Sequence, residues 1–189
     1  TGAGQRIAII DTGVDYTHPD LGGCLGPACK VIGGYDFIHG DIDPMDDHGH
    51  GTHVAATAAG NGVAANGQVL RGIAPDAQIL AYKVLNAGGS GNTAGIVVAI
   101  QRATDPNDDG NTADHANVSS MSIGGLAANP DDIMGQAVDA STAMGVVHTI
   151  AAGNSGATGN PNQGSINSPG SAETGIAVAA ACKTADVGI

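Results

Sequence analysis

Short apolar segments alternate with helical patterns along this chain. Five runs rich in β-branched residues, each bounded by turn-forming or polar residues, predict buried strands. They are Arg6–Ile10, Gln78–Leu85, Val118–Ile123, Val146–Ala152 and Ile176–Ala180. Segments rich in Ala, Val and Ile predict helices at Thr52–Ala59, Thr93–Thr104 and Asp131–Met144. This alternation favours an α/β fold in three layers, with a mainly parallel sheet covered by helices on both faces.

The composition supports a core of small and branched aliphatic residues. Hydrophobic residues make up 42% of the 189 positions, aromatic residues only 2%, and 31 residues are glycine. Such a chain suits strands buried on both faces, with helices that approach closely at Gly and Ala. No repeat, low-complexity tract or linker interrupts the sequence, so we expect residues 1–189 to belong to one domain.

The charge and hydropathy exclude two classes of partner. Lys and Arg number 6 against 18 Asp and Glu, which gives a formal net charge of −12. Nucleic-acid binding requires a basic surface, and a membrane span requires about 20 consecutive apolar residues. We therefore expect neither a nucleic acid nor a membrane as partner. The acidic surface favours solubility and also suits cation binding.

Polar residues follow several of the predicted strands. In parallel sheets the crevice beyond the carboxyl ends of the strands is where ligands bind, which draws attention to Asp11, Ser122 and Asn154. Asp11 ends an Ile-Ala-Ile-Ile run, where an unpartnered carboxylate would be costly to bury. Its Asp-Thr-Gly context has other readings: a turn or N-cap residue, or one half of an aspartic-protease site shared by two subunits.

Histidines cluster at the start of the first predicted helix, in Asp-Asp-His-Gly-His-Gly-Thr-His-Val-Ala from Asp46 to Ala55. An imidazole that projects into a cleft suits a general base, because its pKa lies near neutral pH. A metal site built from His48, His50, His53 and the aspartates is one alternative, and surface histidines without a chemical role are another. The spacing matches none of the zinc signatures.

These motifs together resemble the subtilase family of serine proteases. The matches are Ile-Ile-Asp-Thr-Gly-Val-Asp, His-Pro-Asp-Leu at 18–21, His-Gly-Thr-His-Val-Ala at 50–55, Gly-Ile-Ala-Pro-Asp-Ala at 72–77, Tyr-Lys-Val-Leu at 82–85, Met-Ser-Ile-Gly-Gly at 121–125 and Ala-Ala-Gly-Asn-Ser-Gly at 151–156. They occur in the family's order over nearly the whole chain. The resemblance implies a subtilisin-like α/β domain and hydrolysis of peptide bonds by acyl transfer.

The resemblance assigns the catalytic roles position by position. Asp11 matches the aspartate and His50 the histidine of an Asp/His/Ser triad, so their side chains should lie about 2.6–3.2 Å apart. Asp11 would hold the histidine in one tautomer and stabilise the imidazolium. Asn154 matches the amide that donates to the oxyanion of the tetrahedral intermediate.

The resemblance also implies where a polypeptide substrate binds. Two extended segments would pair with the substrate backbone, namely Gly89, Ser90 and Gly91 on one side and Ser122, Ile123 and Gly124 on the other. Gly124 and Gly153 would lie near the pocket for the side chain that precedes the scissile bond. A secreted, extracellular enzyme is expected.

Some family features differ or do not occur. Ala56 stands where Gly is usual, and Ser120 stands where Asn is common. The nucleophile motif Gly-Thr-Ser-Met-Ala does not occur in residues 1–189. We therefore expect the N-terminal part of a catalytic domain, inactive alone, whose serine lies in a remainder outside this chain. A non-catalytic binding or scaffold chain of the same fold is the alternative.

Two further motifs concern stability. Cys24 and Cys29 bracket a short turn-forming loop and are expected to form a disulfide, with free thiols as the alternative. Cys182 is then left over as the third cysteine.

Asp105, Asn107 and Asp109 place oxygen atoms at alternate positions before Gly110, which resembles the start of a calcium loop. A solvated acidic turn is the alternative there, since the twelfth position is Ala116 rather than Glu.

Overall fold

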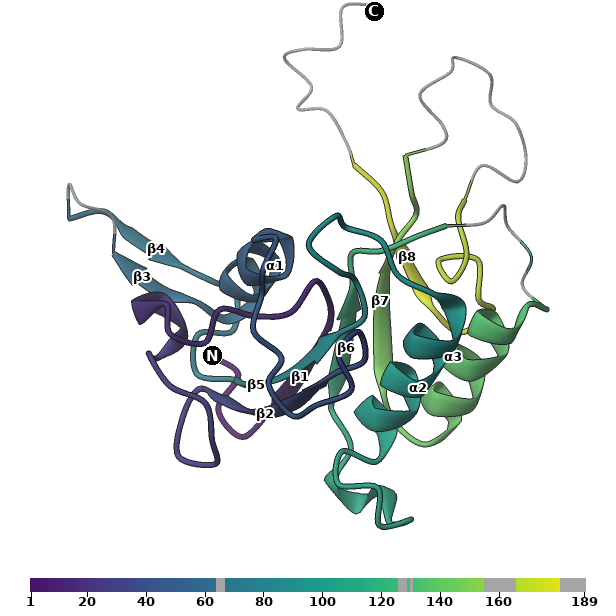
Figure 1. The fold of residues 1–189 in the computed structure, drawn as a ribbon, viewed down its shortest axis with the longest axis horizontal. Coiled ribbons are helices and arrows are strands. Elements are labelled where there is room, and N and C mark those ends of the chain that lie inside the picture. Colours follow the sequence, from purple (N-terminus) through teal and green to yellow (C-terminus); the bar gives the residue numbers. More distant parts are fainter. Residues whose placement is uncertain (64–66, 126–128, 130, 155–165, 181–189) are drawn as a thin grey trace, which may run out of the picture.

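Six parallel strands form the centre of the computed structural model, which describes residues 1–63, 67–125, 129, 131–154 and 166–180. Their spatial order is β2-β5-β1-β6-β7-β8, and every neighbouring pair runs parallel (Figure 1). The strands are β1 (Arg6–Asp11), β2 (Val31–Asp36), β5 (Gln78–Lys83), β6 (Val118–Met121), β7 (Val147–Ala151) and β8 (Ile176–Val178). Their carboxyl ends therefore meet at one edge of the sheet, as the sequence predicts.

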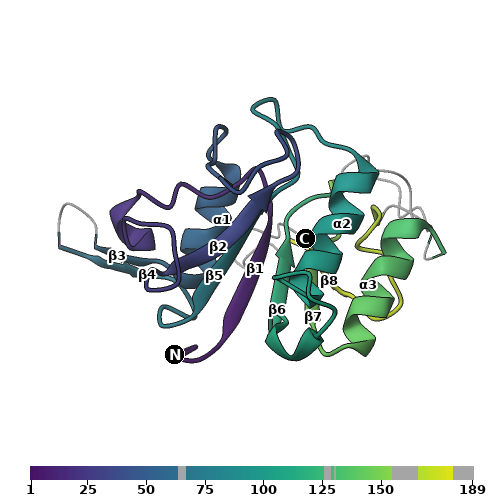
Figure 2. The same cartoon turned by 60° about the horizontal axis from the view of Figure 1, so that its bottom comes forward.

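Helices cover both faces of this sheet. α2 (Thr93–Thr104) and α3 (Ile133–Ala143) lie side by side on one face, and α1 (His50–Ala59) lies on the other (Figures 1 and 2). Each face has its own buried apolar cluster: one contains Ile100 of α2 and Val138 of α3, and the other contains Ala55 and Ala59 of α1. The predicted three-layer α/β/α fold is confirmed.

Strand β1 shows why the apolar runs are continuous. Ala8 and Ile10 belong to the cluster beneath α2 and α3, whereas Ile9 belongs to the cluster beneath α1. All three side chains are 0% exposed. A strand covered on both faces needs apolar side chains at every position, so its sequence lacks the alternation of a half-exposed strand.

The predicted helices are present with small shifts at their starts. α1 begins at His50 rather than Thr52, and α3 begins at Ile133 rather than Asp131. Asp132 is the N-cap of α3, because its carboxylate accepts hydrogen bonds from the amides of Met134 and Gly135. A residue in the capping position has extended rather than helical geometry, which places the start after it.

Three strands were missed by the sequence prediction. β2 contains Gly33 and Gly34, which weaken its strand pattern. A Cβ at Gly34 would collide with the carbonyl oxygen of Ala81, so glycine is required where β2 meets β5. The antiparallel hairpin of β3 (Asn61–Val63) and β4 (Val69–Arg71) has only three residues per strand, too few for a pattern to appear.

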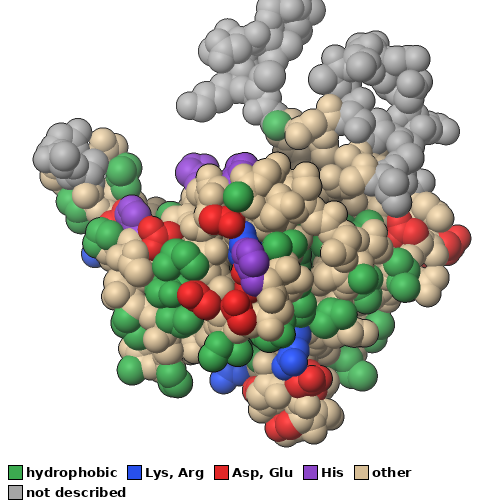
Figure 3. All heavy atoms as spheres, in the orientation of Figure 1, with side chains coloured by type: hydrophobic (Ala, Val, Ile, Leu, Met, Phe, Trp, Pro, Cys, Tyr) green, Lys and Arg blue, Asp and Glu red, His purple; other side chains and the backbone are tan. Residues whose placement is uncertain are grey.

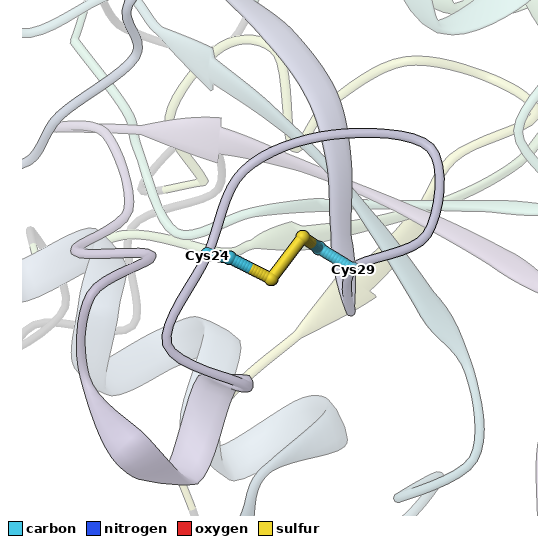
Figure 4. Close-up of a disulfide and its surroundings, with 2 residues drawn as sticks. All are labelled: Cys24 and Cys29. Atoms are coloured by element: carbon cyan, nitrogen blue, oxygen red, sulfur yellow. A yellow bond between two sulfur atoms is a disulfide. The ribbon is translucent and has the colours of Figure 1, made fainter.

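Two short 3-10 helices and one disulfide complete the described chain. The 3-10 helices are η1 (Pro19–Leu21) and η2 (Thr112–Asp114). The disulfide between Cys24 and Cys29 is present, with the Cα atoms 5.7 Å apart, and closes the loop before β2 (Figure 4). This prediction is confirmed, whereas Cys182 lies outside the described residues.

The surface reflects the acidic composition. On the face shown in Figure 3, Asp and Glu side chains are spread over the molecule and Lys and Arg side chains are sparse. None of the described helices has the length and apolar character needed to cross a membrane.

A histidine is buried inside the sheet. His148 of β7 is 1% exposed, and neither ring nitrogen has a hydrogen-bond partner among the described residues. Burial lowers the pKa of His148 to about 4, although the nearby Asp139 carboxylate acts in the opposite direction. The neutral imidazole is therefore the form compatible with the fold.

We predict that His148 makes the fold sensitive to acid. Its folded pKa of about 4 lies below the unfolded value of about 6.5, so the unfolded chain binds the extra proton first as pH falls. The free energy of unfolding should decrease between pH 6.5 and 4, by up to about 3 kcal/mol from this group. His148→Leu should flatten the profile in urea titrations, whereas His53→Gln, at an exposed position, should not. Parallel profiles for wild type and His148→Leu would contradict the prediction.

Candidate active site

A cleft of about 1150 Å³ opens at the carboxyl edge of the sheet. Its walls come from the start of α1 and from the segments that follow β1, β5, β6 and β7. Every substrate-binding residue predicted from the sequence lines it, together with two of the three predicted catalytic residues. The lining set includes His50, Gly89, Ser90, Gly91, Ser122, Ile123, Gly124, Gly153 and Asn154.

Asp11 and His50 form a hydrogen-bonded pair beside this cleft. His50 Nδ1 lies 2.7 Å from Asp11 Oδ1, within the predicted range. The Asp11 side chain is 0% exposed, whereas that of His50 is 44% exposed. A carboxylate only accepts hydrogen bonds, so the proton of the neutral ring resides on Nδ1 and Nε2 retains its lone pair. The predicted pairing is confirmed.

Asp46 holds the loop that leads into α1. Its Oδ1 atom accepts hydrogen bonds from the amides of His48 and Gly49 and from Thr12 Oγ1, and its Oδ2 accepts from the amide and hydroxyl of Thr52. Burial acts to raise the pKa of Asp46, but the hydrogen bonds from Thr52, Gly49 and His48 outweigh it and lower the pKa. The ionised carboxylate thus fixes the turn in which Gly49 adopts φ +98° immediately before His50.

Glycine at position 51 allows helix α1 to reach the end of β1. A Cβ there would collide with the carbonyl oxygen of Gly13 and lie 3.1 Å from Asp11 Cβ. The Gly51 amide donates to Thr12 Oγ1 at 2.9 Å. The glycine in His-Gly-Thr-His is therefore required for the approach that brings His50 to Asp11.

A buried lysine joins three segments beneath the cleft. Lys83, at the end of β5, is 1% exposed, and its ammonium donates to the carbonyls of Thr12 and Leu85 and to Asp47 Oδ1. These partners belong to the segment after Asp11, the segment leading to Gly89 and the loop before His50. Three charged or polar acceptors compensate the desolvation of the ammonium.

The two predicted substrate-pairing segments lie on opposite sides of the cleft. On one side, residues 85 and 91 form an antiparallel bridge, and the Asn86 amide donates to the Ser90 carbonyl, so that Gly89 occupies the turn at φ +71°. On the other side, residues 122–124 continue from β6. Small residues on both sides leave room for an extended peptide.

Asn154 lies beyond the end of β7 and is exposed toward the cleft. Gly153 precedes it with φ +95°, a conformation that L side chains rarely adopt. This turn brings the Asn154 side chain to the same cleft as His50.

The predicted calcium loop is an exposed turn whose side chains form hydrogen bonds with groups of the same turn. Asp105 accepts hydrogen bonds from the amides of Asp109 and Gly110, and Asn107 donates to Asp109 Oδ2 at 3.0 Å. Among the described residues no group of three or more His, Cys, Asp or Glu side chains is arranged to hold a metal ion. Calcium at this turn stays a prediction.

The motifs and geometry agree with comparisons to known proteins. Residues 2–187 match Peptidase_S8, the subtilase family. The chain belongs to the subtilase family. It is 41% identical over 189 residues to the minor extracellular protease Vpr of Bacillus subtilis, covering 95% of this chain and 21% of that protein. Subtilisin DY of Bacillus licheniformis is 39% identical, with 95% and 57% covered.

Solved structures of subtilases show the same fold. The S41 psychrophilic protease matches with a TM-score of 0.75 and 40% identity, over 95% of this chain and 54% of that one. This subtilase chain therefore spans about half the length of the solved structures it matches. The aspartic-protease alternative is wrong, because it required a nearly all-β fold.

Sequence reasoning missed the supporting residues of the site. From the sequence alone, Asp46 is only a candidate metal ligand, and Lys83 is only part of Tyr-Lys-Val-Leu. Asn167, which also lines the cleft, belongs to none of the motifs identified in the sequence. A polar residue beside a catalytic motif is a signal for Asp46, but the partners of Lys83 and Asn167 are distant in sequence.

We predict that Lys83→Met destabilises the chain by about 2–3 kcal/mol, because it leaves two carbonyls and Asp47 without their shared donor. Urea unfolding measures the change. Lys30→Met is the matched control: Lys30 likewise donates to two carbonyls, those of Pro75 and Ala77, but it forms no ion pair with a carboxylate among the described residues. Equal losses in both variants would contradict a special role for Lys83.

Proposed function

We propose that this chain supplies the aspartate, the histidine and the oxyanion donor of a serine endopeptidase. The observation that carries the proposal is the hydrogen bond of 2.7 Å between the wholly buried Asp11 and His50, at the edge of a cleft lined by small residues. Membership of the subtilase family supports the same reaction. The serine nucleophile is proposed to come from a segment outside residues 1–189, since no Gly-Thr-Ser-Met-Ala motif occurs within them.

The geometry suggests how the two residues act. His50 Nε2 would accept the proton of the serine hydroxyl as it attacks the substrate carbonyl, and would return it to the leaving amine. Asp11 holds Nδ1–H throughout, which orients the ring and stabilises the imidazolium. Because Asp11 is buried, this attraction is weakly screened by solvent.

Asn154 and the two substrate segments complete the proposal. The Asn154 amide would donate to the oxygen that becomes negative in the tetrahedral intermediate. Residues 89–91 and 122–124 would pair with an extended polypeptide, and the side chain before the scissile bond would enter between Gly124 and Gly153. No described cleft-lining residue is Asp, Glu, Lys or Arg, so these contacts are neutral.

An extracellular location is part of the proposal. One relative is named an extracellular protease, and the Cys24–Cys29 disulfide is of a kind that persists in oxidising compartments.

The test uses the longest natural chain that contains these residues. A fluorophosphonate should label a serine outside residues 1–189, and His50→Ala should abolish labelling. In subtilisin, a member of this family, loss of the base lowers kcat about 2 × 10⁶-fold, and we borrow that order for peptide hydrolysis here. Asn154→Ala should keep labelling but lose about 10²–10³ in kcat, again the range known for subtilisin.

Two outcomes would contradict the proposal. Labelling of a serine within residues 1–189, blocked by His50→Ala, would place the nucleophile in this chain. Peptide binding without labelling or hydrolysis would instead support the non-catalytic scaffold.

We also propose that the turn of Asp105, Asn107 and Asp109 binds Ca²⁺ through side-chain oxygens, the ligands this hard cation prefers. A ligand that binds only the folded state stabilises it, so a chelator should lower the Tm. Asp105→Ala with Asp109→Ala should remove that sensitivity, whereas Asp131→Ala at another acidic turn should not. If neither the chelator nor the substitutions change the Tm, the turn does not bind Ca²⁺ and is a solvated acidic turn.

A further inference from the structure

Two histidines lie next to each other at the start of α1, and the proposed reaction uses only one of them. His48 and His50 both line the cleft, and their ring centroids are 6.3 Å apart with the ring planes inclined at 74°. The side chain of His48 is exposed, and its ring has no hydrogen-bond partner among the described residues. Its nitrogen atoms are therefore available to a ligand in the cleft.

His50 has the surroundings of a metal-binding histidine. A histidine that binds a metal through one ring nitrogen usually donates its other N–H to a carboxylate, which fixes the tautomer and raises the basicity of the binding nitrogen. Nδ1 of His50 already donates to the buried carboxylate of Asp11 at 2.7 Å, and the ring is 44% exposed. The lone pair of His50 Nε2 is thus prepared for a metal ion as well as for a proton.

The backbone keeps the second ring close to the first. The amide of His48 donates to Asp46 Oδ1 at 2.9 Å, and Gly49 makes the turn between the two histidines. On the opposite wall, a Cβ built on Gly89 would lie 3.4 Å from His48 Nε2, so glycine there leaves space beside this nitrogen.

The separation of the rings suits one shared ion. Two imidazoles bound to a tetrahedral metal at 2.0–2.1 Å place their ring centroids about 5 Å apart, so the rings need to approach by only about 1 Å. A rotation of the exposed His48 side chain provides this movement, because no hydrogen bond to its ring has to break.

Ligand type and charge select the kind of ion. Imidazole nitrogen suits Zn²⁺, Cu²⁺ and Ni²⁺, whereas Ca²⁺ prefers oxygen ligands. Asp46 and Asp47 precede His48, and Lys83 pairs only with Asp47, so the local charge favours a cation. Two protein ligands leave the remaining positions of the ion to water, which makes it exchangeable rather than a fixed part of the fold.

We propose that His48 and His50 together bind a divalent transition metal ion such as Zn²⁺, and that this ion reversibly inhibits the protease. The ion takes the lone pair of His50 Nε2 and releases water. His50 then has no lone pair with which to accept the proton of the serine hydroxyl. The inhibition rests on the proposed function, whereas binding of the metal does not.

The test adds ZnCl₂ to the longest natural chain that contains these residues. Calorimetry measures binding, while peptide hydrolysis and fluorophosphonate labelling measure inhibition. Zn²⁺ should suppress hydrolysis and labelling over the concentration range in which it binds, and a chelator should restore both. Ca²⁺ at the same concentrations should not inhibit.

Two exchanges of histidine for glutamine locate the site. His48→Gln should raise the Zn²⁺ concentration for half-inhibition at least about tenfold, since even the loss of an outer-shell partner weakens metal binding about 10–100-fold. His53→Gln makes the same exchange at an exposed position of α1 that does not line the cleft, and should leave that concentration unchanged. Equal values for wild type and His48→Gln would overturn the assignment.

A measurement on the wild type covers the case in which His48→Gln does not fold. In NMR spectra the ring-nitrogen resonances of His48 and His50 should shift together as Zn²⁺ is added, and a shift of only one ring or of neither overturns the shared site. An active wild type that Zn²⁺ does not inhibit also overturns the inference. If both rings bind Zn²⁺ but the metal-free chain is neither labelled nor active, the metal site is supported and the proposed function is overturned.

Discussion

The carboxylate of Asp11 is the group on which the site depends. It is fully buried at the end of β1, where an ion without partners would cost several kcal/mol. Oδ1 accepts hydrogen bonds from the Thr12 amide and from His50, whereas Oδ2 has no partner among the described residues. Within the described residues both hydrogen bonds to the carboxylate therefore reach the same oxygen, and His50 makes one of them. The hydrogen bond that compensates the buried carboxylate at the end of β1 also orients the ring of His50.

The rest of the cleft is arranged so that this interaction can form. Gly51 lets α1 approach β1, Asp46 fixes the turn before the helix, and Lys83 connects the strand ends to the loop. Each of these residues contacts a segment that is distant in sequence. His50 is thus positioned by backbone packing and by a network of charged hydrogen bonds rather than by the helix alone.

The carboxyl edge of the sheet brings together residues that belong to separate motifs of the sequence. The pairing of Asp11 with His50 and the exposed Asn154 follow motifs that the family shares. Asn167 packs against Gly124 and Gly153, which come from different walls of the cleft.

The sequence by itself determined the layers of the fold and the expected pairing of Asp11 with His50. A continuous apolar run such as the one before Asp11 predicts a strand that is covered by helices on both faces of the sheet. Local sequence motifs identify His50 and Asn154. Only the tertiary structure shows that residues 31–36 form strand β2, because glycine is required at position 34 by the close approach of the Ala81 carbonyl. It also places Asn167 beside Gly124 and Gly153. It also decided the partners of Lys83. These contacts join residues far apart in the chain, and no local pattern of hydrophobic and polar positions encodes the distance between them.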